Sequence, residues 1–210
     1  MPNAQLEAWE GKFGDSYTER NAEGLLQPRI DLWRDIWDEI DGFPEAILEV
    51  GANIGLNLLA LRQMLPHNTP YMAAVEPNAI AREALILNKI PAYLGQAEQL
   101  DFAPDSFDLV FTSGVLVHLS PKPSNGLRES PLYRGCKEIV RVSKKWVVAI
   151  EYFSAEPREV IYRNRPGLLW TQDFGQFYID KFELEPVACG FAWKALTGLD
   201  NLTWWVLRKK

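Results

Sequence analysis

ILEVGANIGLN, residues 47–57, joins an apolar strand to a turn and the start of a helical run. Gly51 and Gly55 let the backbone approach a ligand where a side chain would clash, and the free N–H groups of a helix N-terminus follow. A dinucleotide fingerprint needs the tighter G-x-G-x-x-G, whereas here Asn53 occupies the central glycine position. Glu49 would repel a pyrophosphate but suits an amino group. The stretch favours S-adenosylmethionine, with a plain tight turn as the alternative.

A second short strand is predicted in PYMAAVEPN, residues 70–78, and it ends in Glu76, 25 positions beyond Gly51. In a βαβ unit, an acidic residue near this separation lies at the carboxyl end of the adjacent strand, where its oxygens accept both ribose hydroxyls. Alternatively, Glu76 caps a helix that starts at Pro77, because proline favours the first helical position. One residue can do both.

A third strand with its turn is predicted at residues 92–98, and a fourth strand that leads into a loop at residues 107–118. Gln96 and Ala97, in the turn of the first of these segments, are placed to face an adenine edge through a side-chain amide and a backbone N–H. Strands and helices that alternate in this order build a parallel sheet, whose ligand binds at the carboxyl ends of the first strands.

The remaining segments complete a Rossmann-like, doubly wound α/β fold with a mostly parallel seven-stranded sheet. Residues 132–142 predict a helix and residues 146–151 a fifth strand. Residues 185–193 and 202–208 predict a C-terminal antiparallel hairpin that supplies the last two strands.

Two less regular segments are expected beside the ligand. Residues 3–40 are mostly helical, but glycines interrupt any helix in residues 9–21, which suits an N-terminal helical lid over a cofactor mouth. Residues 122–131 predict a polar loop, and residues 152–173 an irregular insertion rich in arginine and aromatic side chains. We expect one domain over 1–210, with these parts: N-terminal lid and helix (1–40), cofactor-binding core (45–151), substrate-side insertion (152–184) and closing hairpin (185–210).

Charge and composition argue against several classes of partner. The net charge of −6 and the pI near 5.1 disfavour a nucleic-acid backbone, which needs a positive field. Cys136 and Cys189 lack a metal-ligand spacing, and with two histidines in the chain no zinc set is expected. The N-terminus has no leader pattern and no run reaches membrane-spanning length, so a cytoplasmic location is expected and no membrane or metal partner.

Short motifs along the chain carry a resemblance to a known family. They are Trp9, 13–15, 17–21, 48–57, 114–118, Glu151-Tyr152, Tyr162-Arg163, Asp173-Phe174 and 202–204. Through them the chain resembles the class I S-adenosylmethionine-dependent methyltransferases over essentially its whole length, and more narrowly the pseudaminic acid biosynthesis-associated methylases. The resemblance implies methyl transfer to a small molecule, in secondary-metabolite or sugar biosynthesis, with S-adenosylmethionine as cofactor.

The resemblance also implies roles for individual residues. Its cofactor set is Glu49, Gly51, Asn53 and Gly55 around the methionine part, Glu76 and Pro77 at the ribose, Gln96 and Ala97 at the adenine, and Ser113, Gly114 and His118 on the sulfonium side. Arg20 would clamp the cofactor carboxylate from the lid, as suits a guanidinium fork. A surface ion pair of Arg20 with Glu19 or Glu23 is the alternative.

Methyl transfer from a sulfonium chiefly requires alignment and exclusion of water, so an obvious general base is not needed. The candidate catalytic residues are His118, as a proton acceptor, and Tyr17 and Tyr152, as aromatic or hydroxyl contacts to the sulfonium. Arg163 and Arg165 could hold a substrate carboxylate. The alternatives are a structural histidine, core packing of the tyrosines and solvated surface arginines.

Three functions compete at this point. The first is the small-molecule methyltransferase. The second uses the same cofactor site for cyclisation, in which the amino nitrogen of S-adenosylmethionine attacks its own carbon, releases methylthioadenosine and forms a cyclic amino acid of the azetidine-2-carboxylate type. The third is a non-catalytic binding module, against which the glycine turn and Glu76 argue.

Overall fold

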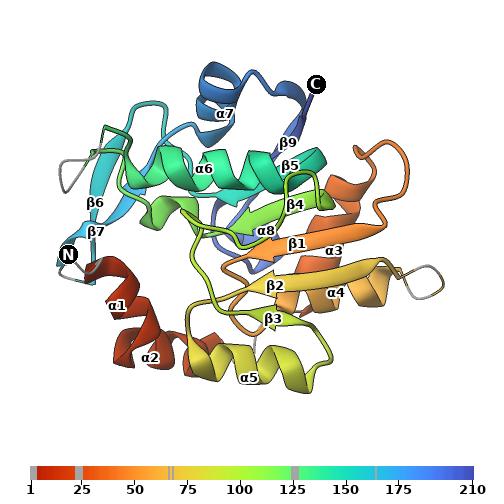
Figure 1. The fold of residues 1–210 in the computed structure, drawn as a ribbon, viewed down its shortest axis with the longest axis horizontal. Helices are drawn as coiled ribbons and strands as arrows, with labels where there is room; N and C mark the ends of the chain where they lie inside the picture. The colour runs from red at the N-terminus through yellow and green to blue at the C-terminus, as the bar shows by residue number, and fades with distance from the viewer. Residues whose placement is uncertain (1–3, 22–25, 66, 68, 124–127, 164) are drawn as a thin grey trace.

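A seven-stranded sheet forms the centre of the computed structural model, which describes residues 4–21, 26–65, 67, 69–123, 128–163 and 165–210 (Figure 1). The strand order is β3-β2-β1-β4-β5-β9-β8, in which the first five strands pair in parallel and β9 pairs antiparallel with both of its neighbours, β5 and β8. The strands are β1 (Ala46–Val50), β2 (Tyr71–Val75), β3 (Ala92–Tyr93), β4 (Phe107–Ser113), β5 (Ser143–Glu151), β8 (Glu185–Ala192) and β9 (Leu202–Arg208). The predicted seven-stranded, mostly parallel sheet is confirmed.

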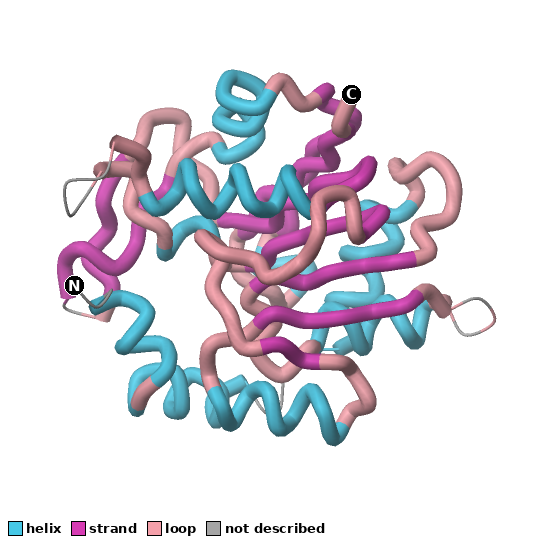
Figure 2. Tube along the Cα trace, viewed as in Figure 1, coloured by secondary structure: helices cyan, strands magenta, loops and turns pink. Residues whose placement is uncertain are grey.

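Helices cover both faces of this sheet, so that the strands form the middle of three layers (Figure 2). One face carries α3 (Leu26–Trp37), α4 (Leu56–Met64) and α5 (Ala79–Leu87), and the other carries α6 (Pro131–Val142) and α7 (Phe174–Phe182). Two short helical segments, η1 (Leu116–His118) and α8 (Lys194–Thr197), lie in loops. Within the described ranges, no helix is long and apolar enough to cross a membrane.

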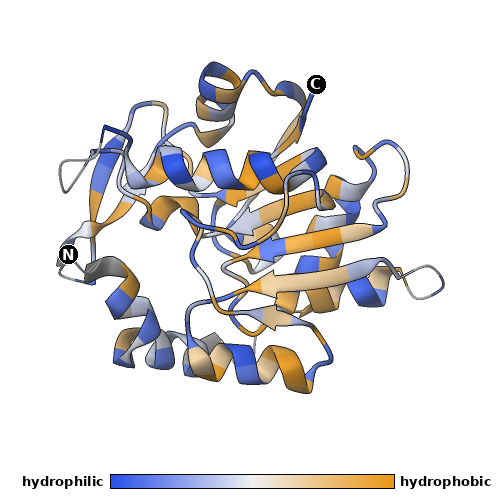
Figure 3. Cartoon of the chain, in the orientation of Figure 1, coloured by the Kyte–Doolittle hydropathy of each residue, from blue (hydrophilic) through white to orange (hydrophobic). Residues whose placement is uncertain are grey.

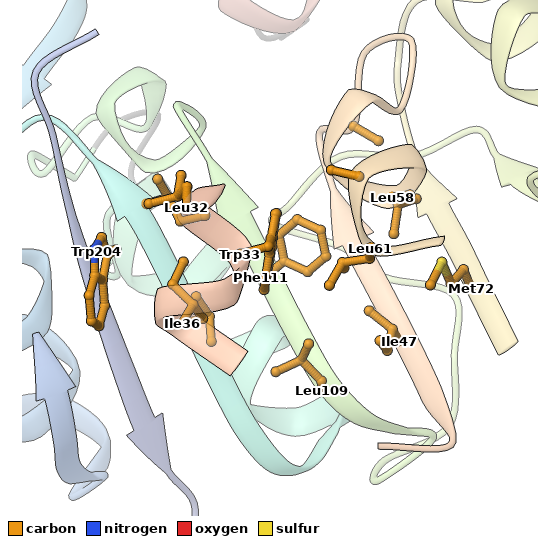
Figure 4. Close-up of a cluster of buried hydrophobic side chains, with 14 of the residues drawn as sticks. Leu32, Trp33, Ile36, Ile47, Leu58, Leu61, Met72, Leu109, Phe111 and Trp204 are labelled. Atoms are coloured by element: carbon orange, nitrogen blue, oxygen red, sulfur yellow. The ribbon is translucent and has the colours of Figure 1, made fainter. Parts of the chain in front are cut away.

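Alternating side chains of the strands build two apolar cores, one on each face. In β1, Ile47 packs with the α3 and α4 side and Leu48 with the α6 side, and both are fully buried. On the first face, the rings of Trp33 and Phe111 meet edge to face at 4.6 Å between centroids (Figure 4). Figure 3 shows hydrophobic strands, and α6 alternates hydrophobic and hydrophilic positions along its length. Each such buried side chain contributes about 1.5–3 kcal/mol, which fixes the sheet on which the site is built.

The order in which successive strands are added to the sheet changes direction between β1 and β4. From β1 the chain builds outward through β2 to β3, and then returns to the other side of β1 with β4 and β5. Ligands of open α/β sheets bind beside the carboxyl ends of strands at such a switch point. The order therefore places the site next to the ends of β1 and β4.

The N-terminal segment is more regular than its glycines predict. It forms α1 (Ala4–Glu10) and α2 (Lys12–Asn21), so the expected interruption within residues 9–21 is wrong apart from the turn at Gly11. Gly14 lies inside α2, where a Cβ would come within 1.8 Å of the Trp9 carbonyl oxygen and 2.9 Å of Asn78 Nδ2. Gly14 thus permits close packing and does not break the helix.

The expected irregular insertion at residues 152–173 is also wrong in part. It contains an antiparallel hairpin of its own, β6 (Arg158–Tyr162) and β7 (Arg165–Thr171), separate from the main sheet. Leu169 and Trp170 of β7 are buried. The hairpin acquires this apolar face from tertiary packing next to η1, which local periodicity does not reveal.

Candidate active site

A cavity of about 420 Å³ lies at the carboxyl ends of β1, β2, β4 and β5. Its volume falls within the range of about 300–1,000 Å³ typical of small-molecule pockets. Many residues expected from the sequence line it: Tyr17, Glu49, Gly51, Asn53, Glu76, Pro77, Gln96, Ala97, Ser113, Gly114, His118, Tyr152 and Arg163. The fold therefore brings together residues from most of the chain in one space.

Glu49, near the end of β1, has a buried carboxyl group in which one oxygen is hydrogen-bonded to a side chain and the other has no hydrogen-bond partner among the described residues. Its Oε1 accepts a 2.7 Å hydrogen bond from Asn57 Nδ2, and Asn57 Oδ1 in turn accepts one from Trp33 Nε1 at 3.4 Å. Glu49 Oε2 has no hydrogen-bond partner within the described structure. Burial raises the pKa of Glu49 to about 8, opposed by the Asn57 bond and by the charge of Arg29. A cationic group in the cavity would find an acceptor here.

The glycine turn after β1 depends on Gly51 and Gly55 for different reasons. Gly51 has φ of 75°, lines the cavity, and a Cβ on it would lie 2.5 Å from Val115 Cγ2. Gly55 has φ of 80°, and a Cβ on it would lie 2.5 Å from Leu85 Cδ2 of α5. Gly55 does not line the cavity. The structure therefore gives Gly55 a packing role, and its expected contact with the cofactor stays a prediction.

Glu76 follows β2, and its carboxylate stabilises the glycine turn through hydrogen bonds. Its Oε2 accepts the Asn53 N–H at 2.7 Å and its Oε1 the Asn78 N–H at 2.9 Å. The N-cap of α5 is Asn78, whose Oδ1 accepts from Ala81 N, so the expected helix start at Pro77 is wrong by two residues and Glu76 is not the cap. Each carboxylate oxygen retains a second lone-pair site for a ligand hydroxyl.

The wall beside β3 is formed by Gln96 and Ala97. Gln96 Oε1 is buried and has no partner among the described atoms, while Ala97 is 6% exposed. An unsatisfied buried acceptor costs about 1–3 kcal/mol, so a ligand that donates a hydrogen bond here is favoured.

Beyond β4, Ser113 and Gly114 lead into η1, which is held by a residue that the sequence analysis did not assign to the site. Glu151 Oε1 accepts the N–H groups of Val115 and Leu116 at 3.1 Å each, and Oε2 accepts that of Val117 at 3.5 Å. Burial raises the pKa of Glu151 to about 7. The sequence signal that could have identified Glu151 is its position at the end of a buried strand. Its hydrogen bonds hold Val115 against the glycine turn.

His118 lies in the cavity wall with its ring held on several sides. Nδ1 is 2.7 Å from the Leu168 carbonyl oxygen, and the ring centroid is 4.7 Å from that of Trp9 and 5.7 Å from that of Tyr162. Burial lowers the pKa of His118, so the imidazole is neutral near pH 7. The hydrogen bond to a backbone carbonyl matches the structural alternative for this histidine.

The cavity wall contains two charged residues that no sequence motif predicted, Arg29 and, beside Tyr152, Asp200. The Tyr152 hydroxyl donates to Asp200 Oδ2 at 2.7 Å, and Asp200 Oδ1 accepts from Lys194 Nζ at 3.0 Å. Arg29 of α3 also lines the cavity, and burial lowers its pKa against the opposing charge of Glu49. Neither Arg29 nor Asp200 belongs to a recognisable motif, so only the fold could bring them here.

The three arginines expected from the sequence have different outcomes. Arg163 lines the cavity, is exposed, and its guanidinium carbon lies 5.9 Å from the Phe13 ring centroid. The side chains of Arg20 and Arg165 lie outside the described part of the structure, as does Glu23, so their roles stay predictions.

These polar atoms fit S-adenosylmethionine. Among the described residues of the cavity wall, three buried acceptor oxygens lack partners: Glu49 Oε2, Asn53 Oδ1 and Gln96 Oε1. The cofactor carries matching donors in its ammonium group, ribose hydroxyls and adenine amino group, and such pairing removes the cost of unsatisfied buried oxygens.

Residues 48–145 match the family model described as a methyltransferase domain. The chain is an enzyme that transfers methyl groups, with S-adenosylmethionine as its cofactor. The match runs from β1 to the beginning of β5 and so contains the glycine turn, Glu76 and the loop at Gln96. The methyltransferase is thus an enzyme, which excludes the non-catalytic binding module. No curated protein matches it in sequence.

Solved structures share this fold at low sequence identity. A Leishmania major S-adenosylmethionine-dependent methyltransferase has a TM-score of 0.71 and 17% identity, covering 97% of this chain and 81% of its own. A Burkholderia thailandensis 1,6-didemethyltoxoflavin N1-methyltransferase, solved with 1,6-didemethyltoxoflavin and S-adenosylhomocysteine, has a TM-score of 0.67 and 14% identity over 99% and 86%. A possible histamine N-methyltransferase from Thermotoga maritima has a TM-score of 0.65 and 12% identity, covering 98% of this chain and 100% of its own. At these identities the likeness concerns the fold.

Proposed function

We propose that this methyltransferase acts on a small molecule inside the cavity. The observation that carries the proposal is that the cavity has a second half beyond the cofactor residues. Tyr152, Tyr162, Leu169 and Asp200 line that half, on the side of β5, the β6–β7 hairpin and β9. A total volume of about 420 Å³ lies within the range of about 300–1,000 Å³ typical of small-molecule pockets. The Burkholderia structure is a precedent, since it holds a small heterocycle beside S-adenosylhomocysteine.

The chain's own residues orient the cofactor along the sheet. Glu49 Oε2 binds the ammonium group and Arg29, whose charge acts on Glu49, binds the carboxylate of the methionine part. Glu76 accepts from the ribose, Gln96 faces the adenine, and the backbone at Ser113 borders the sulfonium. Bound in this way, the cofactor supplies an electrophilic methyl group. Arg29 is given this role because it lies in the described cavity wall, and the clamp predicted for Arg20 stays a prediction.

The N-terminal helices form the lid of this site. Asn53 Nδ2 donates to Thr18 Oγ1 at 3.0 Å, and Asn78 Nδ2 donates to Asp15 Oδ1 at 2.8 Å, so α2 is bonded to the glycine turn after β1 and to the N-cap of α5. Trp9 at the end of α1 packs on His118. These few contacts hold the helices over the cavity yet are weak enough to release for entry of the cofactor.

Catalysis rests on enclosure and alignment. His118 stays neutral, and the backbone bond at Nδ1 holds its ring in the wall. Tyr17 and Tyr152 enclose the reacting atoms and exclude water, which is the main requirement of an in-line displacement. Arg163 at the rim attracts an anionic group of the substrate. The resemblance to pseudaminic acid biosynthesis-associated methylases favours a substrate from sugar or secondary-metabolite biosynthesis.

The test uses S-adenosylmethionine with a CD₃-labelled methyl group. The protein is incubated with this cofactor and, in separate reactions, with the small-molecule fraction and the macromolecular fraction of a cell extract, and products are identified by mass spectrometry. S-adenosylhomocysteine together with a CD₃-labelled small molecule is the expected result. Methylthioadenosine formed without any acceptor would show the cyclisation instead. Label found only in protein or nucleic acid would overturn the small-molecule assignment.

A further inference from the structure

Tyr152 and Asp200 lie on the opposite side of the cavity from the residues that face the adenosine. Glu76 and Gln96 follow β2 and β3, whereas Tyr152 follows β5 and Asp200 precedes β9. In the strand order, β1 and β4 separate these two groups. Tyr152 and Asp200 therefore border the space left for the methyl acceptor.

The hydrogen bond between these two residues can have only one direction. Asp200 Oδ2 lies 2.7 Å from the Tyr152 hydroxyl, and Asp200 Oδ1 accepts from Lys194 Nζ at 3.0 Å. A carboxylate has no proton to donate, so the phenol proton points at Asp200. The Tyr152 oxygen consequently offers only lone pairs to the cavity.

Neither residue is suited to take up a proton. The hydrogen bond from Tyr152, followed by the effects of Lys194, lowers the pKa of Asp200. Burial, together with the Asp200 charge, raises the pKa of Tyr152. The pair thus stays a neutral phenol bonded to a carboxylate across the range in which enzymes work, and it binds donors without acting as a base.

We propose that the Tyr152 oxygen accepts an N–H hydrogen bond from the methyl acceptor, with Asp200 as its positioning residue, so that the substrate is an amine. The proposal rests on the proposed function and names its substrate class. A neutral amine can donate an N–H to Tyr152 while its lone pair points at the methyl carbon. A hydroxyl must instead lose its only proton to become a good nucleophile, which calls for a base.

The step balances without any further reagent. The nitrogen lone pair forms the N–CH₃ bond while the S–CH₃ bond breaks, and that bond's electron pair stays on sulfur as a thioether. The methylated nitrogen carries the positive charge and loses its proton to water afterwards. The Asp200 carboxylate and the ring of Tyr17, both in the cavity wall, stabilise this cation through charge and cation–π attraction.

Sinefungin tests this without a known substrate, because it resembles S-adenosylhomocysteine but carries an amino group at the position of the transferred methyl. Calorimetry gives the affinities of both ligands for the wild type and for Tyr152→Phe, which keeps the ring and removes the oxygen. The sinefungin preference is the affinity for sinefungin divided by the affinity for S-adenosylhomocysteine. We expect this ratio to fall about tenfold or more from the wild type to Tyr152→Phe, and by a smaller factor in Asp200→Asn. The affinity for S-adenosylhomocysteine itself should stay within about twofold of the wild type. Tyr71→Phe, at the exposed start of β2, is the matched control.

The outcomes separate this proposal from the function on which it rests. An unchanged preference in Tyr152→Phe would overturn it, as would CD₃ label on oxygen, carbon or sulfur in the product of the labelling assay. A wild-type protein that binds neither ligand would instead overturn the proposed function. Label on nitrogen together with the lost preference is the expected result.

Discussion

Replacement of Glu49 by glutamine should abolish a proton release that accompanies cofactor binding. Burial raises the pKa of Glu49 to about 8 in the ligand-free protein, so the carboxyl group is about 90% protonated at pH 7. A cationic ammonium group beside Oε2 lowers a carboxyl pKa by about 1–3 units. The bound form is then at most about half protonated at pH 7. Binding should therefore release about 0.4–0.9 proton per cofactor.

Calorimetry of S-adenosylhomocysteine binding measures this number directly. The observed enthalpy at pH 7, plotted against the ionisation enthalpy of the buffer, has a slope equal to the protons exchanged. Glu49→Gln should bring the slope to about zero and weaken binding by about 1.5–3 kcal/mol, the value of a charge-assisted hydrogen bond. Glu83→Gln, on the exposed side of α5, should leave both unchanged. A wild-type slope of zero, or the wild-type slope retained in Glu49→Gln, would refute the role of Glu49.

Other predictions follow from the same geometry. Glu76→Gln in folded protein should weaken S-adenosylhomocysteine binding at least tenfold by calorimetry; unchanged affinity would remove the ribose contact. Amide hydrogen exchange in residues 9–21 should slow on binding, whereas equal rates would reject the lid. His118→Ala should lower turnover less than tenfold, since a loss of a hundredfold would identify a general base. The raised pKa of Glu151 means that the folded state binds more protons than the unfolded state, so the free energy of unfolding should fall between pH 4.5 and 7 by at most about 1.4 kcal/mol per pH unit. A free energy of unfolding, measured with urea, that rises over this pH range would contradict this.

The sheet could be predicted because its signals are local. Residues 47–57 and 70–78 carry apolar strands that end at glycine, glutamate or proline, and the alternation of strands with helices specifies a parallel sheet. The residues at the strand ends, such as Glu49 and Glu76, follow from that topology, and the structure brings them into one cavity.

The other half of the cavity could not be predicted because it depends on contacts between distant segments. Arg29 and Asp200 are separated by most of the chain and belong to no motif, yet both line the cavity with Tyr152. Gly14 predicts a helix break by its intrinsic preference, but close packing on the Trp9 carbonyl outweighs that preference. Local propensity thus failed where tertiary packing decides the conformation.

A crystal structure of the protein with S-adenosylhomocysteine tests the central claim most directly, namely that the cavity holds the cofactor in one orientation along the sheet. The account predicts the ligand ammonium within hydrogen-bond distance of Glu49 Oε2, its ribose hydroxyls at Glu76 and its adenine beside Gln96. A ligand bound in the reverse orientation, or outside this cavity with Glu49 Oε2 still unpaired, would contradict it.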